Sequence, residues 1–202
     1  MLKLFFATSN AAKVTSVARV LGGRGIEVVR LDVDLPELQA ESAAEIAVGK
    51  ARAAYEVTKA PVIVIDSAFH IASLGGFPGT YVKWATQQIG VSGYLDLLAR
   101  YTADSARACT FVDALAYMDA SHAKPLVLLR NEHGRVAKEP LGTLRPAFKS
   151  PLATVFIPDG ESKTLAEMTD EELAAYRSRS RMEHHLQTLA DILTCTPQSF
   201  EE

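Results

Sequence analysis

Apolar runs and amphipathic segments alternate along the first third of the chain. Residues 2–7, 26–31 and 62–65 are short runs of bulky apolar side chains, a pattern that is typical of buried strands. Residues 11–21 and 42–58 instead space their apolar side chains by three or four positions, which predicts helices. Strands that alternate with helices in this way favour a sheet that contains parallel strands.

The rest of the chain changes to consecutive strands followed by helices. Residues 91–101 have helical spacing, residues 108–118 and 126–137 predict two long strands joined by a polar turn, and residues 154–157 predict a short strand. Residues 169–193 predict one broken helix or two adjacent helices. The pattern as a whole predicts an α/β fold with a mixed twisted sheet.

Composition narrows the class of protein further. The 202 residues have a net charge of -3, a hydrophobic content of 48% and a mean hydropathy of +0.07, which favours one globular domain over residues 1–202. This charge gives no general attraction to nucleic acid or membranes, and no apolar run approaches the roughly 20 residues of a membrane span. The two cysteines lack disulfide-framework or metal-site spacing, so we expect a cytoplasmic protein.

The first predicted loop carries a group of polar residues. Thr8, Ser9, Asn10 and Lys13 lie between a strand and the start of a helix. Free N–H groups and the helix dipole favour an anion at such a position, so this loop is a candidate phosphate site. The simpler interpretation is that Ser9 or Asn10 caps the helix and Lys13 is solvated.

A carboxylate stands in the first turn of the second predicted helix. Ser42 and Glu45 have the spacing of a capping box, in which the glutamate folds back onto the helix start. The same carboxylate, which follows an acidic stretch, could bind Mg²⁺, a hard ion that prefers oxygen ligands. The sequence leaves both roles of Glu45 open.

Asp66 follows the apolar run 62–65 and is expected at the end of that strand. A carboxylate there is partly desolvated, which suits a catalytic base or a metal ligand. The alternative is a structural acid held by the N–H groups of Ser67 and Ala68. The glycine-rich loop that follows, which includes Gly76, allows a ligand to approach the backbone closely.

Four motifs occur in a fixed order along nearly the whole chain: FFATSNAAK, DLPELQAESAAEIAVGKA, VIVIDSAFHIASLGGFPGTYVKW and FIPDGESKTLAEMTDEE. Together they resemble the motifs of the non-canonical purine nucleoside triphosphate pyrophosphatases, the inosine and xanthosine triphosphatases. The resemblance implies two lobes around a central nucleotide cleft and a homodimer. It also implies Mg²⁺-dependent hydrolysis of a nucleoside triphosphate to the monophosphate and pyrophosphate.

The resemblance also implies roles for single residues. Glu45 and Asp66 would bind Mg²⁺, and Asp66 would orient or deprotonate the attacking water. Cations on the phosphoryl oxygens and a base within about 3 Å of the water are what such a reaction needs, so Asp66, Lys13 and Lys50 form the expected catalytic set. The residues expected to hold the phosphates are Thr8, Ser9, Asn10, Lys13, Lys50 and Ser67.

The chain departs from the family pattern mainly where the base would bind. Ile65 replaces the first of two expected acids, and Leu173 replaces an expected lysine. Residues 150–154 contain neither the aromatic rings nor the acid of the family's base pocket. The candidates that remain for the base are Phe148, Arg177, Ser178 and Arg179.

These departures leave three functions open. The favoured one is a pyrophosphohydrolase with an altered base preference, because a pocket that hydrogen-bonds one base rejects bases that leave its polar groups unpaired. The missing acid at Ile65 motivates a second, a nucleotide-binding protein that has lost catalysis. The third is an ordinary inosine or xanthosine triphosphatase in which Arg177 and the loop around Phe148 replace the lost contacts.

Overall fold

A computed structural model describes residues 2–36, 38–101, 103–145, 148, 150–179 and 184–195. Its centre is a twisted seven-stranded sheet with the order β2-β1-β3-β5-β6-β7, and β4 pairs with β3 outside this path. Strands β1, β2 and β3 are parallel, and the remaining pairs are antiparallel. The strands are β1 (Leu2–Ala7), β2 (Ile26–Leu31), β3 (Val62–Ile71), β4 (Pro78–Gly79), β5 (Ala108–Met118), β6 (Leu126–Val136) and β7 (Phe156–Pro158).

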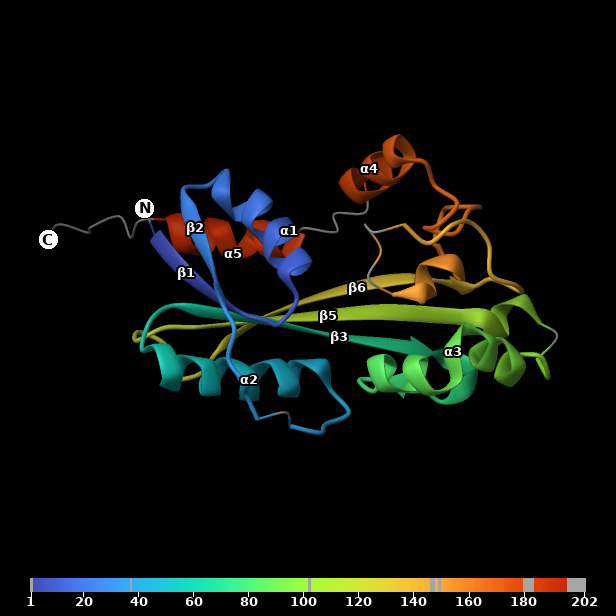
Figure 1. Cartoon of the computed structure of the whole chain (residues 1–202), viewed down its shortest axis with the longest axis horizontal. Helices are drawn as coiled ribbons and strands as arrows, with labels where there is room; N and C mark the ends of the chain where they lie inside the picture. Colours follow the sequence, from blue (N-terminus) through green and yellow to red (C-terminus); the bar gives the residue numbers. More distant parts are fainter. Residues whose placement is uncertain are drawn as a thin grey trace, which may run out of the picture.

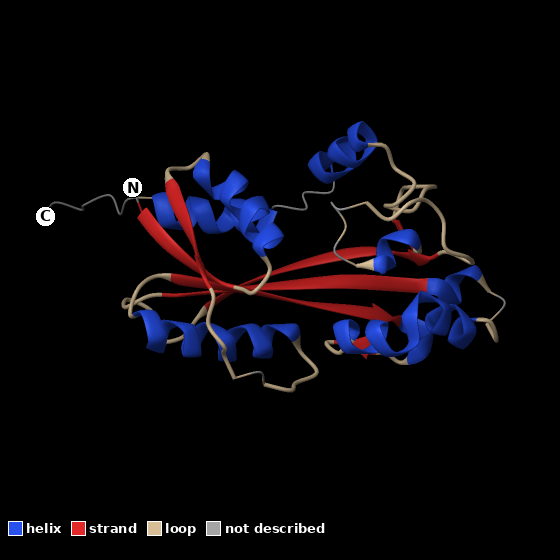
Figure 2. Cartoon of the chain, viewed as in Figure 1, coloured by secondary structure: helices blue, strands red, loops and turns tan. Residues whose placement is uncertain are grey.

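Helices cover both faces of this sheet (Figures 1 and 2). Helices α1 and α5 lie over one face, while α2 and α3 lie under the other, and α4 stands above the opposite end of the long strands (Figure 1). The helices are α1 (Ala11–Gly22), α2 (Ala43–Thr58), α3 (Val82–Leu98), α4 (Asp170–Arg179) and α5 (His184–Thr194), with short 3₁₀ turns η1 (Ala72–Leu74), η2 (Asp104–Arg107) and η3 (Pro151–Thr154).

The molecule has two lobes that share the long strands β3, β5 and β6 (Figure 1). One lobe holds β1, β2, α1, α2 and α5, and the other holds α3, α4, η3 and β7 (Figure 1). The predicted α/β class with a mixed sheet and two lobes is therefore confirmed.

The open edge of β3 is the feature that creates the site. β1 is short, and its last register partner on β3 is Ile63, opposite Phe6. The next strand on that edge, β4, begins to pair only at Phe69. Among the described residues, positions 64–68 of β3 therefore have a strand neighbour on one side only, where β5 pairs throughout.

Three predicted boundaries are wrong, each for a local reason. β3 continues to Ile71, so Asp66 is in the middle of a strand and not at its end; polar residues interrupt the apolar run because that edge is open. Helix α3 begins at Val82, nine residues early, directly after the glycine-rich turn, and is kinked at Gly90. β7 begins at Phe156, because Thr154 belongs to η3.

The remaining elements agree with the prediction to within one or two residues. The region 169–193 contains two helices, and residues 180–183 between them lie outside the described residues.

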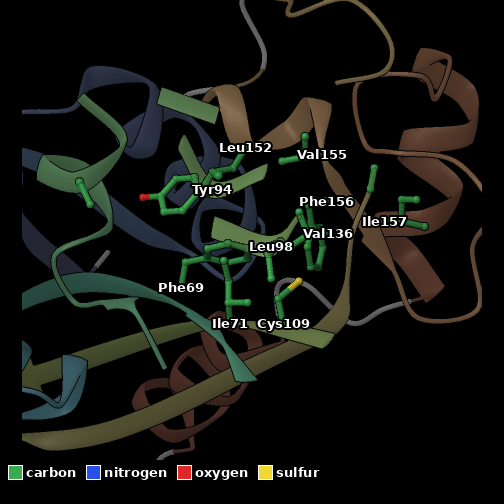
Figure 3. Close-up of a cluster of buried hydrophobic side chains, with 12 residues drawn as sticks. Phe69, Ile71, Tyr94, Leu98, Cys109, Val136, Leu152, Val155, Phe156 and Ile157 are labelled. Carbon is green, nitrogen blue, oxygen red and sulfur yellow. The ribbon is translucent and has the colours of Figure 1, made fainter. Parts of the chain in front are cut away.

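Aromatic side chains fill the core of the lobe that contains α3 (Figure 3). The ring of Phe111 lies 4.4 Å from that of Phe69 and 4.9 Å from that of Phe156, measured between centroids. Tyr94 and Leu98 of α3 pack into the same cluster and are fully buried. This packing fixes the far half of β3 and so holds the open edge in place.

Gly134 on β6 should tolerate no side chain. A Cβ atom there would lie 2.4 Å from the Ile157 carbonyl oxygen and 2.7 Å from the Phe156 ring. We expect Gly134→Ala to lower the free energy of unfolding by about 1–3 kcal/mol, the usual cost of overpacking. Urea unfolding of the wild type and the variant measures this difference in the free energy of unfolding. The matched control is Gly22→Ala, where a Cβ has nothing within 4 Å; an equal loss in both variants would contradict the steric explanation.

Candidate active site

A cleft of about 700 Å³ opens beside the free edge of β3, between α2 and α3. Charged groups lie on its wall at Lys13, Lys50, Asp66 and Lys83. Its other lining residues are Leu38, Gln39, Ile46, Ser67, Thr80, Tyr81, Val82, Trp84 and Gln87. Three lysines and one carboxylate give the wall an excess of positive charge, which favours an anionic ligand.

Asp66 and Lys50 form an ion pair on this wall. The Lys50 Nζ lies 3.1 Å from Asp66 Oδ1, and the side chains are 15% and 20% exposed. Asp66 Oδ2 is buried and has no hydrogen-bond donor among the described residues. One carboxylate oxygen is thus held by a cation while the other is buried without a hydrogen-bond donor.

Lys13 projects from the first turn of α1 to the open edge of β3. Its Nζ donates to the Ile65 carbonyl oxygen at 3.3 Å. This bond serves a backbone group that a neighbouring strand would otherwise occupy, and it keeps the ammonium at the rim of the cleft.

A second cavity of about 220 Å³ lies near the same edge. Lys13 and Ser67 line both cavities. The other residues of the second wall are Ser16, Val17, Arg19, Ile65, Asp113, Arg177, His185 and Leu186. Adjacent strand residues point to opposite faces, so Asp66 points toward α2 while Ile65 and Ser67 point toward α1 and α5.

A partly buried ionic network supports the second cavity. Asp113 and Arg130 are register partners on β5 and β6, and the guanidinium donates to Asp113 Oδ2 from NH2 at 2.8 Å and from Nε at 3.1 Å. Arg130 also donates to Glu132 Oε2 at 2.8 Å, and Ser67 Oγ donates to Asp113 Oδ1 at 2.5 Å. Burial opposes the charged form of Asp113, but the Arg130 guanidinium and the Ser67 hydroxyl lower its pKa. Asp113 is therefore ionised at neutral pH.

Comparison with known proteins identifies the family of the chain. The model of the Ham1 family matches residues 4–188. This chain belongs to the Ham1 family. It is 36% identical over 180 residues to the dITP/XTP pyrophosphatase of Methanopyrus kandleri, covering 89% of this chain and 92% of that protein. It is 38% identical over 175 residues to inosine triphosphate pyrophosphatase 1 of Trypanosoma cruzi, covering 84% and 83%.

Solved Ham1-family structures have the same architecture. A dITP/XTP pyrophosphatase from Mycobacterium abscessus aligns with a TM-score of 0.74 at 27% identity, over 96% of this chain and 100% of the other. A HAM1 protein from Coxiella burnetii aligns with a TM-score of 0.78 at 23% identity, over 97% and 100%, which supports the fold alone. The family resemblance drawn from the four motifs is confirmed.

Four of the predicted residues meet at the cleft of this Ham1-family protein: Lys13, Lys50, Asp66 and Ser67. The N-terminal loop is placed differently. Asn10 Oδ1 accepts from the Lys13 backbone N–H at 3.2 Å, and Thr8 Oγ1 accepts from the Asn10 N–H at 3.1 Å. Thr8, Ser9 and Asn10 are not among the residues that line either cavity, so the helix-capping interpretation fits Asn10.

Glu45 is exposed and lies outside the cleft wall, although its neighbour Ile46 and Lys50 line it. The capping prediction is confirmed for Ser42, whose hydroxyl accepts from the Ala44 N–H at 3.2 Å. Within the described ranges, no group of three or more His, Cys, Asp or Glu side chains is placed to hold a metal ion.

Of the residues predicted for the base, only Arg177 lines a cavity. Phe148 packs on the cluster of Met168, Leu173 and Tyr176, which also explains the leucine at position 173. Three other candidates lie apart from both cavities. Arg179 donates to Glu161 Oε1 at 2.6 Å, Ser178 is exposed on α4, and Gly76 forms a turn at φ 89°.

The sequence prediction missed Asp113, Arg130 and His185. Asp113 and Arg130 did carry a signal, because two opposite charges inside long predicted strands require a partner when the strands are buried. Trp84 was also missed as a cleft residue, since the glycine-rich segment concealed the start of α3.

The described helices include none long and apolar enough to cross a membrane.

His185 should make stability depend on pH. Burial lowers its pKa from 6.5 to about 4, so the folded protein keeps it neutral while the unfolded chain is protonated below about pH 6.5. The unfolded state then binds more protons between these values, and stability falls as the pH drops from about 6.5 to 4, by about 3 kcal/mol in total. Urea unfolding at pH 7 and pH 4.5 measures this loss.

We expect His185→Gln to reduce the difference between the two pH values. The exposed neighbour provides the control, His184→Gln, which should retain it. An unchanged pH dependence in the His185 variant would reject the assignment.

Proposed function

We propose that this protein hydrolyses a nucleoside triphosphate to a nucleoside monophosphate and pyrophosphate. The observation that carries the proposal is the meeting of Asp66, Lys50 and Lys13 at one cleft in a chain of the Ham1 family. The names of the relatives, dITP/XTP and inosine triphosphate pyrophosphatases, support the same reaction.

Lys13 and Lys50 reduce the electrostatic repulsion between the triphosphate and the nucleophile. A triphosphate repels an approaching nucleophile, and cations beside its oxygens reduce that repulsion as negative charge develops on the leaving pyrophosphate. Lys50 is held near the reacting centre by its ion pair with Asp66, and Lys13 is held at the rim by the Ile65 carbonyl. Because both ammonium groups are fixed before binding, little reorganisation is needed during the reaction.

Asp66 acts on the water. The Lys50 ammonium pairs with Oδ1 and keeps the Asp66 carboxylate at the cleft wall, where the carboxylate would accept the water proton. The water oxygen forms a bond to the α-phosphorus while the bond from that phosphorus to the bridging oxygen breaks, and pyrophosphate leaves with the electron pair. Asp66 thereby orients or deprotonates the nucleophile.

We further propose Mg²⁺ as the cofactor. A buried carboxylate oxygen without a hydrogen-bond donor, Asp66 Oδ2, suits a hard cation, which would polarise the phosphoryl oxygens when bound. Glu45 is exposed and outside the cleft wall, which argues against a direct role for it at the metal.

The base preference is proposed to differ from that of an inosine-specific enzyme. Among the residues predicted to contact the nucleobase, Arg177 lines a cavity. In the segment 150–154, which lacks the family's base-pocket groups, Leu152 and Ala153 of η3 are buried in the core. A pocket with different polar groups accepts a different set of bases. A cytoplasmic homodimer is also proposed, on the resemblance and on the two free cysteines, Cys109 and Cys195.

Asp66→Asn should remove most of the activity. The amide keeps the shape of the side chain but cannot accept a proton, so we expect pyrophosphate release to fall by about 100-fold or more. A panel of purine and pyrimidine triphosphates with Mg²⁺ is assayed for pyrophosphate.

Asp96→Asn, an exposed acid of α3 outside both cavities, serves as the matched control and should keep full activity. The absence of turnover with every triphosphate would reject the hydrolase and leave the nucleotide-binding function. A strong preference for inosine triphosphate would reject the altered base preference alone.

Magnesium titration tests whether Glu45 binds the metal ion together with Asp66. We expect Glu45→Gln to change the Mg²⁺ concentration for half-maximal activity by less than about threefold, because the side chain is exposed outside the cleft and glutamine still suits a capping box. Removal of Mg²⁺ with a chelator should stop pyrophosphate release. An increase of about tenfold or more in the Mg²⁺ concentration for half-maximal activity of the Glu45 variant would contradict this expectation and indicate that Glu45 binds the metal.

A further inference from the structure

Large apolar side chains are exposed inside the cleft of the candidate active site. Trp84 is 63% exposed, Leu38 52% and Tyr81 46%, and all three line the cleft that carries Lys50 and Asp66. A single exposed apolar side chain is ordinary, but several that gather in one concave site mark a surface that a ligand or a partner covers. The proposed hydrolysis explains the lysines and the carboxylate, and it leaves this apolar surface unexplained.

Trp84 stands on a fixed part of helix α3. Trp84 and Gln87 are three positions apart and both line the cleft, so the first turns of the helix direct one side to it. The Thr80 hydroxyl donates to the carbonyl oxygen of Ala40 at 2.7 Å just before the helix, and Ala85 is buried in the core of this lobe. The indole is therefore held on the cleft wall by its backbone while its ring remains exposed.

The opposite wall of the cleft is apolar as well. Leu38 lies against α2, because a Cβ atom on Gly49 would lie 3.8 Å from its Cδ2, and Ile46 of α2 lines the same cleft. Tyr81 and Trp84 come from the start of α3, which belongs to the other lobe (Figure 1). Apolar surface thus faces the cleft from both lobes, and aromatic rings form the α3 side.

A nucleobase matches this part of the cleft. It is apolar on its faces, which stack on an indole, and polar at its edge, where the amide of Gln87 offers both a donor and an acceptor. The lysines proposed for the phosphates line the same cleft, whose volume of about 700 Å³ is in the range that holds a whole small-molecule ligand. Leu152 and Ala153, in the segment expected to contact the base, are buried and leave this task to other residues.

We propose that Trp84 binds the nucleobase by stacking and gives this protein a preference for purine over pyrimidine nucleotides. This inference rests on the proposed function and names the class of base for the same site. It assigns the base to the large cleft, and not to the smaller cavity beside Arg177. A purine has two fused rings and covers more of an indole than the single ring of a pyrimidine, so stacking favours the purine. Trp84 acts on specificity, while Asp66 and the lysines act at the phosphates.

The first test measures binding without turnover. The α,β-imido triphosphates of inosine, adenosine and uridine keep the charge of the proposed substrate, and nitrogen replaces the bridging oxygen at the bond that the proposed reaction breaks. Each is titrated into the full chain with Mg²⁺ by calorimetry. Inorganic triphosphate, which has no base, is titrated in the same way and reports the contribution of the phosphates alone.

We expect both purine analogues to bind more tightly than the uridine analogue by about threefold or more, and more tightly than inorganic triphosphate. Trp84→Leu keeps an apolar side chain without a ring and should weaken purine binding by about tenfold, the usual effect of removing an aromatic ring that stacks on a base. Inorganic triphosphate should bind to this variant as to the wild type. Trp84→Phe should restore part of the loss.

The matched control is Val57→Ala. Val57 is 61% exposed near the end of α2 and lines neither cavity, so this variant should keep the purine preference. A thermal melt confirms that each variant is folded, and light scattering reports its mass. If Trp84→Leu does not fold, Trp84→Phe decides the proposal by a purine preference smaller than that of the wild type.

Kinetics with natural triphosphates provide the second test. Stacking on a base far from the reacting phosphorus contributes equally to the ground state and the transition state, so Trp84→Leu should raise KM for purine triphosphates by about tenfold and change kcat little. The ratio of kcat/KM between purine and pyrimidine triphosphates should fall by a similar factor.

Three results would overturn the proposal. One is a purine affinity that Trp84→Leu leaves unchanged, and another is a loss that is equal for inorganic triphosphate. The third is a change of mass in solution with the purine preference intact, which would assign Trp84 to a contact between copies of the chain. Pyrophosphate release that persists in any of these cases leaves the hydrolase intact, whereas absence of release by the wild type rejects the proposed function itself.

Discussion

The site depends on the incomplete pairing of one strand edge. A backbone edge that lacks a neighbouring strand must be satisfied by other groups or by water. β1 stops opposite Ile63 and β4 starts opposite Phe69, so the intervening residues of β3 depend on what approaches from α1. Lys13 donates a hydrogen bond to the Ile65 carbonyl oxygen, and this contact places a cation where it can bind an anionic ligand. Because β1 is short, the edge of β3 stays open and the Lys13 ammonium lies beside it.

The ionic network on the central strands stabilises the arrangement on the other side of the same edge. The pairing of Asp113 with Arg130 is costly to bury, and its cost is offset by the hydrogen bonds to Ser67 and Glu132. Burial raises the pKa of Glu132 despite the neighbouring Arg130 guanidinium, which lowers it. The network is therefore a set of mutually dependent groups, and the orientation of Ser67 is fixed by residues on two neighbouring strands.

The sequence predicts the elements with uniform patterns and fails where function interrupts the pattern. Strands Leu2–Ala7, Ile26–Leu31 and Ala108–Met118 were predicted with their observed bounds, because each has a consistent apolar pattern. The extension of β3 past Asp66 was missed since polar residues at an open edge resemble a loop. Lys50 and Asp66 were predicted as site residues and lie together, but the role of Asp113 depends on its register with Arg130 across the hairpin, which apolar periodicity does not report.

The position of Trp84 gives the chain an internal optical probe. It is the single tryptophan of the sequence, its side chain is 63% exposed, and it stands on the wall of the large cleft at the start of α3. Indole emission depends on the polarity around the ring, so all of the tryptophan fluorescence of this protein originates at the mouth of the cleft. A change in spacing between the two lobes would alter the environment of this ring, and the natural sequence reports such motion without an attached label.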